Sequence, residues 1–135
     1  MNLKIVLLND GWVDLKIIMN EQSMMISFEY TPNDAFVELL MSSIQLCSYK
    51  DDFTIIFPNG SDRKLLFIKK IDKNYCKVSI GKHSEELSIK QFIRAVLMMF
   101  DKFAHDYSIE QYVEGWRHFF PQKELEILRA NYRML

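Results

Sequence analysis

The sequence contains few of the residues that build catalytic loops, metal centres and disulfide frameworks. It has four glycines, three prolines, two cysteines and three histidines in 135 residues. The scarce glycines form no phosphate-binding loop and no Gly-x-Ser-x-Gly nucleophile elbow. Two cysteines without a Cys-x-x-Cys pair exclude a disulfide-rich scaffold and the common zinc motifs. These absences argue against an enzyme that uses one of these short catalytic or cofactor-binding motifs.

Long apolar runs are also missing. No stretch approaches eighteen uncharged apolar residues, so we predict no transmembrane helix. The apolar run at residues 3–8 is interrupted by Asn9-Asp10-Gly11, and no small-residue cleavage site follows, which argues against a signal peptide. A hydrophobic content of 49% argues against disorder. We therefore expect a cytoplasmic protein that forms one domain over residues 1–135.

The cysteines and histidines suggest no reactive centre. Cys47 and Cys76 lie in apolar patterns, which favours two buried free thiols; a disulfide or a reactive thiol is the alternative. His83, His105 and His118 have no helical metal spacing, so a zinc site would need ligands from scattered segments. Asp106 beside His105 could orient a base, but a helix C-terminus also attracts histidine. We predict no catalytic, cofactor-binding or metal-binding residues, and no enzyme.

Hydrophobic periodicity predicts an α+β fold: two antiparallel β-meanders each followed by a helix, helices packed on one face of the sheet, and two smaller C-terminal helices. We expect strands at residues 3–8, 12–19, 24–30, 53–57, 64–71, 75–80 and 85–87, and helices at residues 31–48, 89–104, 109–116 and 122–133. The pattern of the first strand predicts that both of its faces are covered. Whether the meanders join into one curved sheet is left open.

Three helix starts carry capping signals. Thr31 can cap the first helix, with Pro32 at the first helical position and Asp34 in the first turn. Residues 88–91 and 108–111 both have the capping-box form, with serine at the cap and glutamine three residues later. The helix over residues 89–104 has the broadest apolar face, so we expect it to be the best-buried helix.

Charge is sorted along the chain. Residues 1–60 carry eight acidic residues and three lysines, a net charge of −5, whereas residues 61–82 carry seven basic and two acidic residues, a net charge of +5. The remaining residues have a net charge of −1, as does the whole chain. An almost neutral protein with an acidic and a basic zone is suited to docking on a charged protein partner.

The acidic zone supplies the candidate partner-binding residues, which are Asp10, Trp12, Asp14, Glu21 and Glu29. They lie on or between neighbouring strands of the first meander. An acidic patch with an exposed aromatic ring is typical of a protein-binding surface, because the charge steers the encounter and the ring supplies buried area. The alternative is that Trp12 belongs to the core and the acids only solvate turns.

The basic zone suggests a second function class. Phe67 and Tyr75 lie among its lysines, and sheets that bind single strands combine cations with aromatic platforms. Against this, both rings follow the alternation of a core face, and the sequence pI of about 6.3 is far from that of a basic domain. Lysines also solubilise exposed sheet edges. Single-stranded nucleic-acid binding through residues 63–82 is therefore the alternative function.

The layout resembles the small immunity proteins of bacterial toxin systems, including those of contact-dependent growth inhibition. The resemblance is carried by the chain length, the two meander-plus-helix units, the acidic zone, the junction at residues 30–36 and the lack of a catalytic set. It implies a cytoplasmic protein that binds and neutralises a cognate toxin, with no small-molecule substrate and no membrane partner. A nuclease toxin would present a basic phosphate-binding site, which an acidic surface could cover.

Overall fold

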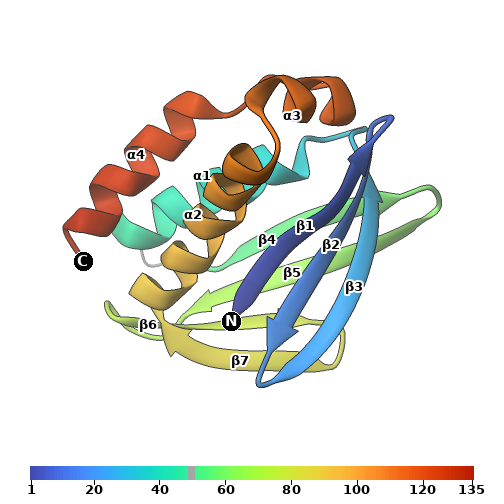
Figure 1. Ribbon diagram of the computed structural model, residues 1–135. Helices are drawn as coiled ribbons and strands as arrows, with labels where there is room; N and C mark the ends of the chain where they lie inside the picture. Colours follow the sequence, from blue (N-terminus) through green and yellow to red (C-terminus); the bar gives the residue numbers. More distant parts are fainter. Residues whose placement is uncertain (49–50) are drawn as a thin grey trace.

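The computed structural model describes residues 1–48 and 51–135, which form seven strands and four helices (Figure 1). The strands are β1 (Asn2–Asn9), β2 (Trp12–Met19), β3 (Gln22–Glu29), β4 (Phe53–Asn59), β5 (Asp62–Lys70), β6 (Tyr75–Ile80) and β7 (His83–Ser88). The helices are α1 (Ala35–Ser48), α2 (Ile89–Asp106), α3 (Ile109–Trp116) and α4 (Gln122–Arg133). The predicted α+β class, with two antiparallel meanders each followed by a helix, is confirmed.

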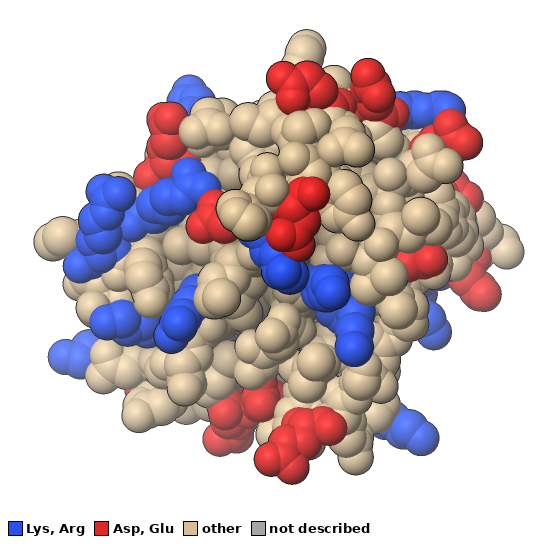
Figure 2. All heavy atoms as spheres, in the orientation of Figure 1, with Lys and Arg blue, Asp and Glu red and all other residues tan. Residues whose placement is uncertain are grey.

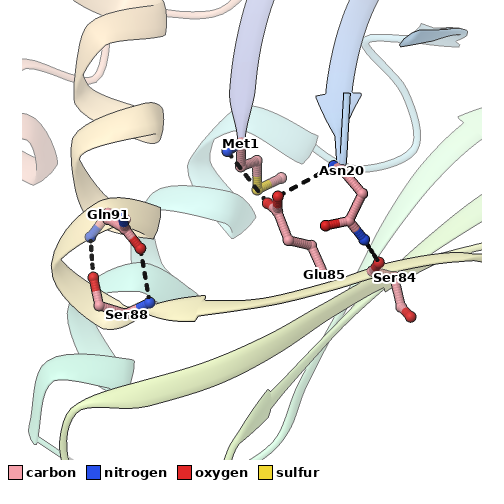
Figure 3. Close-up of polar contacts among 6 residues, drawn as sticks. All are labelled: Met1, Asn20, Ser84, Glu85, Ser88 and Gln91. Carbon is pink, nitrogen blue, oxygen red and sulfur yellow. Dashed lines mark hydrogen bonds and ion pairs between the residues drawn. The ribbon is translucent and has the colours of Figure 1, made fainter. Parts of the chain in front are cut away.

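Over the described residues, the two meanders form separate sheets, ordered β1-β2-β3 and β4-β5-β6-β7. They are joined by packing of Phe28 of β3 against Phe57 of β4, with ring centroids 4.7 Å apart, and by a few polar contacts. In the β2–β3 turn, the backbone N–H of Asn20 donates to Glu85 Oε1 at 3.1 Å, and its side-chain amide donates to the Ser84 carbonyl at 2.6 Å (Figure 3). At the end of β4, the side-chain amide of Asn59 donates to the Ser27 carbonyl of β3 at 3.1 Å. These bonds link neighbouring ends of the sheets without a strand ladder.

The helices gather on one side of the sheets, as predicted (Figure 1). Helix α2 packs against β1 of the first sheet and β7 of the second, while α1 packs against β4. Helix α4 covers α1 and α2, and α3 lies against β1 and β2. The apolar core therefore lies between this helical layer and the inner faces of both sheets.

Helix α2 begins at the predicted capping box. The Gln91 N–H donates to Ser88 Oγ at 3.0 Å, and the Ser88 N–H donates to Gln91 Oε1 at 3.1 Å (Figure 3). These reciprocal bonds satisfy two donors at the helix start. The helix buries Ile89, Phe92, Ile93, Ala95, Val96, Leu97, Met99, Phe100 and Phe103. This is more than any other helix buries, as its broad apolar face predicted.

The first helix begins at Ala35, so the predicted start at Thr31 and Pro32 is wrong. Asp34 is the cap instead. Its Oδ1 accepts the Val37 N–H at 3.2 Å, and its carbonyl accepts a further N–H from the first turn at 3.1 Å. A carboxylate here satisfies a free helical donor and complements the positive end of the helix dipole.

The expectation that β1 is covered on both faces is also wrong. Leu3 and Ile5 point into the core, but a β-bulge shifts the register between Ile5 and Leu7. The extra residue reverses the alternation, so Leu8 packs against the core while Val6 and Leu7 are exposed. The unbroken apolar run is therefore a change of register and does not indicate two buried faces.

Aromatic rings connect the first sheet to three helices. Phe28 of β3 lies 5.6 Å from Trp116 of α3, measured between ring centroids. Phe36 of α1 lies 4.9 Å from Trp116 and 5.6 Å from Phe100 of α2. These rings meet edge to face, a geometry that stabilises aromatic pairs beyond the area they bury.

The β1–β2 turn fits tightly against α3. The Gly11 N–H donates to the Gly115 carbonyl at 2.6 Å, and a Cβ atom added at Gly115 would lie 2.6 Å from the carbonyl oxygen of Leu8. That oxygen belongs to the β1 backbone and cannot rotate away. Gly115 is therefore required by the close approach of a helix to a strand.

We predict that Gly115→Ala lowers the free energy of unfolding by about 1–3 kcal/mol, the usual cost of overpacking. Alanine favours helix formation by about 1 kcal/mol over glycine, so a loss of stability can only come from the steric contact with Leu8. Urea denaturation measures the change. The exposed neighbour provides the control: Glu114→Ala should change stability by no more than about 0.5 kcal/mol. Equal stability of wild type and Gly115→Ala would contradict the close contact.

Candidate docking surface

The outer face of the first sheet points away from the core. On β2, Val13, Leu15, Ile17 and Met19 are buried, and the alternate residues point outward. We call this surface the first outer face; it comprises Lys4, Leu7, Asn9, Trp12, Asp14, Lys16, Ile18, Ser23, Met25, Ser27 and Glu29. Four of the five predicted partner-binding residues lie on or beside it.

Trp12 lies on the first outer face and outside the core, with its side chain half-buried. Its indole N–H donates to Asp14 Oδ1 at 3.3 Å, and the Ser27 hydroxyl donates to the same oxygen at 2.5 Å. Glu29 stands opposite Trp12 in the β2–β3 register. Trp12, Asp14 and Glu29 therefore form one cluster, in which Asp14 fixes the indole ring.

The two turn acids lie at opposite ends of β2. Asp10 sits in the β1–β2 turn beside Trp12, and its carboxylate is 3.8 Å from the Arg117 guanidinium. Glu21 sits in the β2–β3 turn, seven residues beyond Asp14, a separation of about 23 Å along an extended strand. The structure brings Asp10 next to the Trp12 cluster but leaves Glu21 outside it.

Basic residues interrupt the acidic zone. Lys4 and Lys16 stand directly opposite each other on the first outer face, between the Trp12 cluster and Glu21. Figure 2 shows acidic and basic side chains interspersed over the face in view, with a basic band across its middle. The sorting of charge along the chain therefore does not produce a continuous acidic face.

One exposed apolar residue near Trp12 was not among the predicted site residues: Leu7 is 47% exposed and stands opposite Asp14. Met25 is 53% exposed but stands opposite Lys16, two rows from Trp12, and Val6, 43% exposed, lies beside Phe103 of α2. The apolar run at residues 5–8 carries the signal for Leu7, although the same run predicts burial on both faces. An exposed leucine next to an aromatic ring and carboxylates adds apolar area to a candidate docking surface.

His118 and Asp34 hold the loop between β3 and α1 against the end of α3. The His118 Nε2–H donates to the Tyr30 carbonyl at 2.7 Å, and Nδ1 lies 3.8 Å from the Asp34 carboxylate. Asp34 Oδ1 also accepts the Trp116 indole N–H at 3.0 Å. Because a carbonyl can only accept, the Nε2 proton is committed to the backbone. The arrangement positions α3. Because Nε2 of His118 donates its proton to the Tyr30 carbonyl, this nitrogen is not free to act as a base.

The other histidines have separate surroundings. His105 is exposed at the end of α2 and lies 3.2 Å from Asp106. A hydrogen bond from Lys102, and then one from His105, lowers the pKa of Asp106, as expected for an exposed ion-pair network at a helix end. His83 contacts Gln22 of the first sheet at 3.1 Å. Among residues 1–48 and 51–135, no three histidine, cysteine, aspartate or glutamate side chains converge as metal ligands.

A cleft of about 560 Å³ lies between the start of β1, β7 and α2. Glu85 contributes a carboxylate to it, with Oε1 bound to the Asn20 N–H and Oε2 3.2 Å from the Met1 amino group (Figure 3). Arg94 and Lys102 of α2 also line the cleft. Both oxygens of Glu85 contact groups of the first meander, so this carboxylate on β7 joins the two sheets.

Both cysteines are free thiols, as predicted, but only Cys76 is fully buried. Burial raises the pKa of Cys76 to about 12. The pKa of Cys47 is also raised by burial, and the charge of Lys70 partly offsets that rise. A raised pKa keeps the thiol protonated and unreactive at neutral pH.

No family model matches the chain, nor does any curated protein or solved structure. Among the described residues, no helix combines the length and apolar character needed to cross a membrane.

We predict that Cys76 resists alkylation by iodoacetamide in the native protein, whereas Cys47 reacts slowly and both react in denaturant. The single variants Cys47→Ala and Cys76→Ala separate the two rates by mass spectrometry. Rapid modification of Cys76 in native Cys47→Ala would contradict its burial.

An unfolded thiol has a pKa of about 8.5, so the contribution of Cys76 to stability is complete below that pH and is lost as the pH rises toward about 12. The fall in unfolding free energy above about pH 8.5 should therefore be less steep in Cys76→Ala.

Proposed function

We propose that this protein binds another protein through the Trp12 end of the first outer face. The supporting observation is the half-buried Trp12 ring, held by Asp14, with the exposed side chain of Leu7 in the next row of the same face. An aromatic anchor with adjoining apolar area supplies the desolvated centre of an interface. The rigid sheet beneath it limits the entropy that binding must overcome.

The acids around Trp12 favour a basic partner. Asp14 and Glu29 lie next to the ring along and across the strands, so a cationic surface approaching this end is attracted, while Arg117 offsets part of the charge of Asp10. Asp14 accepts only hydrogen bonds from neutral groups, so its charge remains uncompensated by any ion pair within the described residues. The cluster therefore contributes both electrostatic steering and an anchored ring.

The concrete form of the proposal is a cytoplasmic immunity protein that neutralises a cognate bacterial toxin. A nuclease toxin fits the surface best, because a site that holds phosphates is basic. Docking of the Trp12 cluster over that site would exclude the nucleic-acid substrate. This mode of inhibition requires no catalytic residue in the immunity protein.

The decisive experiment uses the toxin domain encoded by the reading frame next to this gene. Cells that express this domain should stop growing, and co-expression of the protein should restore growth. The purified pair should form a complex of defined stoichiometry in sedimentation. The absence of a toxic neighbour, or toxicity that the protein does not relieve, would refute the immunity function.

We predict that the double variant Asp14→Asn, Glu29→Gln slows association with the toxin by about tenfold at low salt and less at high salt, because two steering charges are lost. Asparagine retains an oxygen acceptor for the Trp12 indole. Trp12→Ala should mainly speed dissociation, since it removes the anchor. Surface plasmon resonance measures both rates.

The charge-matched control is Glu124→Gln, Glu126→Gln on α4, which lies with the helices on the other side of the fold (Figure 1). This control should associate at the wild-type rate. Equal slowing in both double variants would attribute the effect to net charge and remove the Trp12 cluster from the interface.

A further inference from the structure

The second sheet carries an aromatic and basic surface that the proposed toxin binding does not use. Phe67 of β5 is 46% exposed and Tyr75 of β6 is 52% exposed. Their neighbours Leu66, Ile68 and Cys76 are buried, so both rings lie on the outer face of this sheet. The interpretation of Phe67 and Tyr75 as core residues, which argued against nucleic-acid binding, is wrong.

Two lysines lie between the rings. Lys69 and Lys77 stand directly opposite each other in the β5–β6 register, two residues from Phe67 and Tyr75 respectively. Like charges opposite each other destabilise a sheet, and neither lysine forms an ion pair within residues 1–48 and 51–135. Glu86, opposite Lys77 on β7, offsets part of this charge. A bound anion would relieve the remaining repulsion.

The spacing of these groups is ordered along the strands. Tyr75 lies four residues from Phe67 along the strand direction, a distance of about 14 Å at 3.4 Å per residue. The lysine pair lies midway, two residues from each ring. The β5–β6 turn fixes Tyr75, because Asp72 Oδ1 accepts its backbone N–H at 2.9 Å. Rings on either side of paired cations match the alternation of bases and phosphates in an unpaired strand.

We propose that the outer face of β5 and β6 binds single-stranded nucleic acid, with bases stacked on Phe67 and Tyr75 and phosphate bound by Lys69 and Lys77. This surface lies on a different sheet from the Trp12 cluster, so it goes beyond the proposed toxin binding. A polyanion without bases could occupy the lysines alone, but only bases use both the rings and the charges.

The test is fluorescence anisotropy with a labelled oligothymidylate of about 12 nucleotides, within the range that small single-strand binders cover. Wild type should bind, and its affinity should fall about sevenfold from about 50 to 200 mM salt, as expected when two phosphates are neutralised. Phe67→Ala and Tyr75→Ala should each weaken binding about fivefold or more. Circular dichroism and thermal unfolding confirm that each variant is folded.

The first sheet offers a matched control for the lysines. Lys69→Glu, Lys77→Glu should abolish binding, whereas Lys4→Glu, Lys16→Glu should retain it, although it makes the same charge change in the other opposed lysine pair. Protection against the toxin by Lys69→Glu, Lys77→Glu should equal that of wild type. The two proposals can therefore fail independently.

Five outcomes would overturn this inference. The first four concern oligonucleotides. They are no oligothymidylate binding by wild type at low salt, equal loss in both lysine double variants, equally tight binding of a duplex, and binding that is insensitive to Phe67→Ala and Tyr75→Ala. Heparin and polyglutamate serve as base-free polyanions. If polyglutamate competes as well as the oligonucleotide, the surface recognises acidic protein instead.

Discussion

Burial of α2 against both sheets is the contact on which the rest of the structure depends. Over the described residues the sheets share no strand ladder, and α2 packs on β1 of one and β7 of the other. Each fully buried large apolar side chain contributes about 1.5–3 kcal/mol, and α2 buries eight of them together with Ala95. The hydrogen bonds of Asn20 contribute about 0.5–1.5 kcal/mol each. Apolar packing, by α2 and by Phe28 of β3 against Phe57 of β4, therefore sets the arrangement of the sheets, and the polar contacts fix its local details.

This arrangement decides where a partner can bind. The helices gather on one side, which leaves the outer faces of the sheets available (Figure 1). Charges that are separated in sequence mix on these faces, because a meander places distant residues in neighbouring rows; Lys4 and Lys16 thus interrupt the acidic zone. The 23 Å or so between Asp14 and Glu21 exceeds a Debye length of about 8 Å at physiological salt. The two acids consequently act on a partner separately.

Periodicity predicted the strands and helices well, because it reports which residues face the core. It failed where tertiary contacts decide. Asp34 caps α1 while it also binds Trp116, a residue far away in sequence. The bulge near Val6 depends on pairing with β2, which no local pattern reveals. Of the predicted site residues, Trp12 and its neighbouring acids form a cluster because they lie at the same end of β2. Glu21 lies at the other end of β2, and only the strand register shows this separation.

The second sheet shows why apolar alternation alone could not assign its faces. Along β5, Leu65 and Phe67 alternate with Leu66 and Ile68, so either set could have formed the core, whereas on β6 only Tyr75 interrupts an otherwise polar outward set. The helical layer selects the set with Leu66, Ile68 and Val78, and Phe67 and Tyr75 are left in water. Inward and outward positions alternate residue by residue, so outer side chains can change without altering the core. Recognition by this fold is therefore separable from its stability, and each outer face can acquire its own partner.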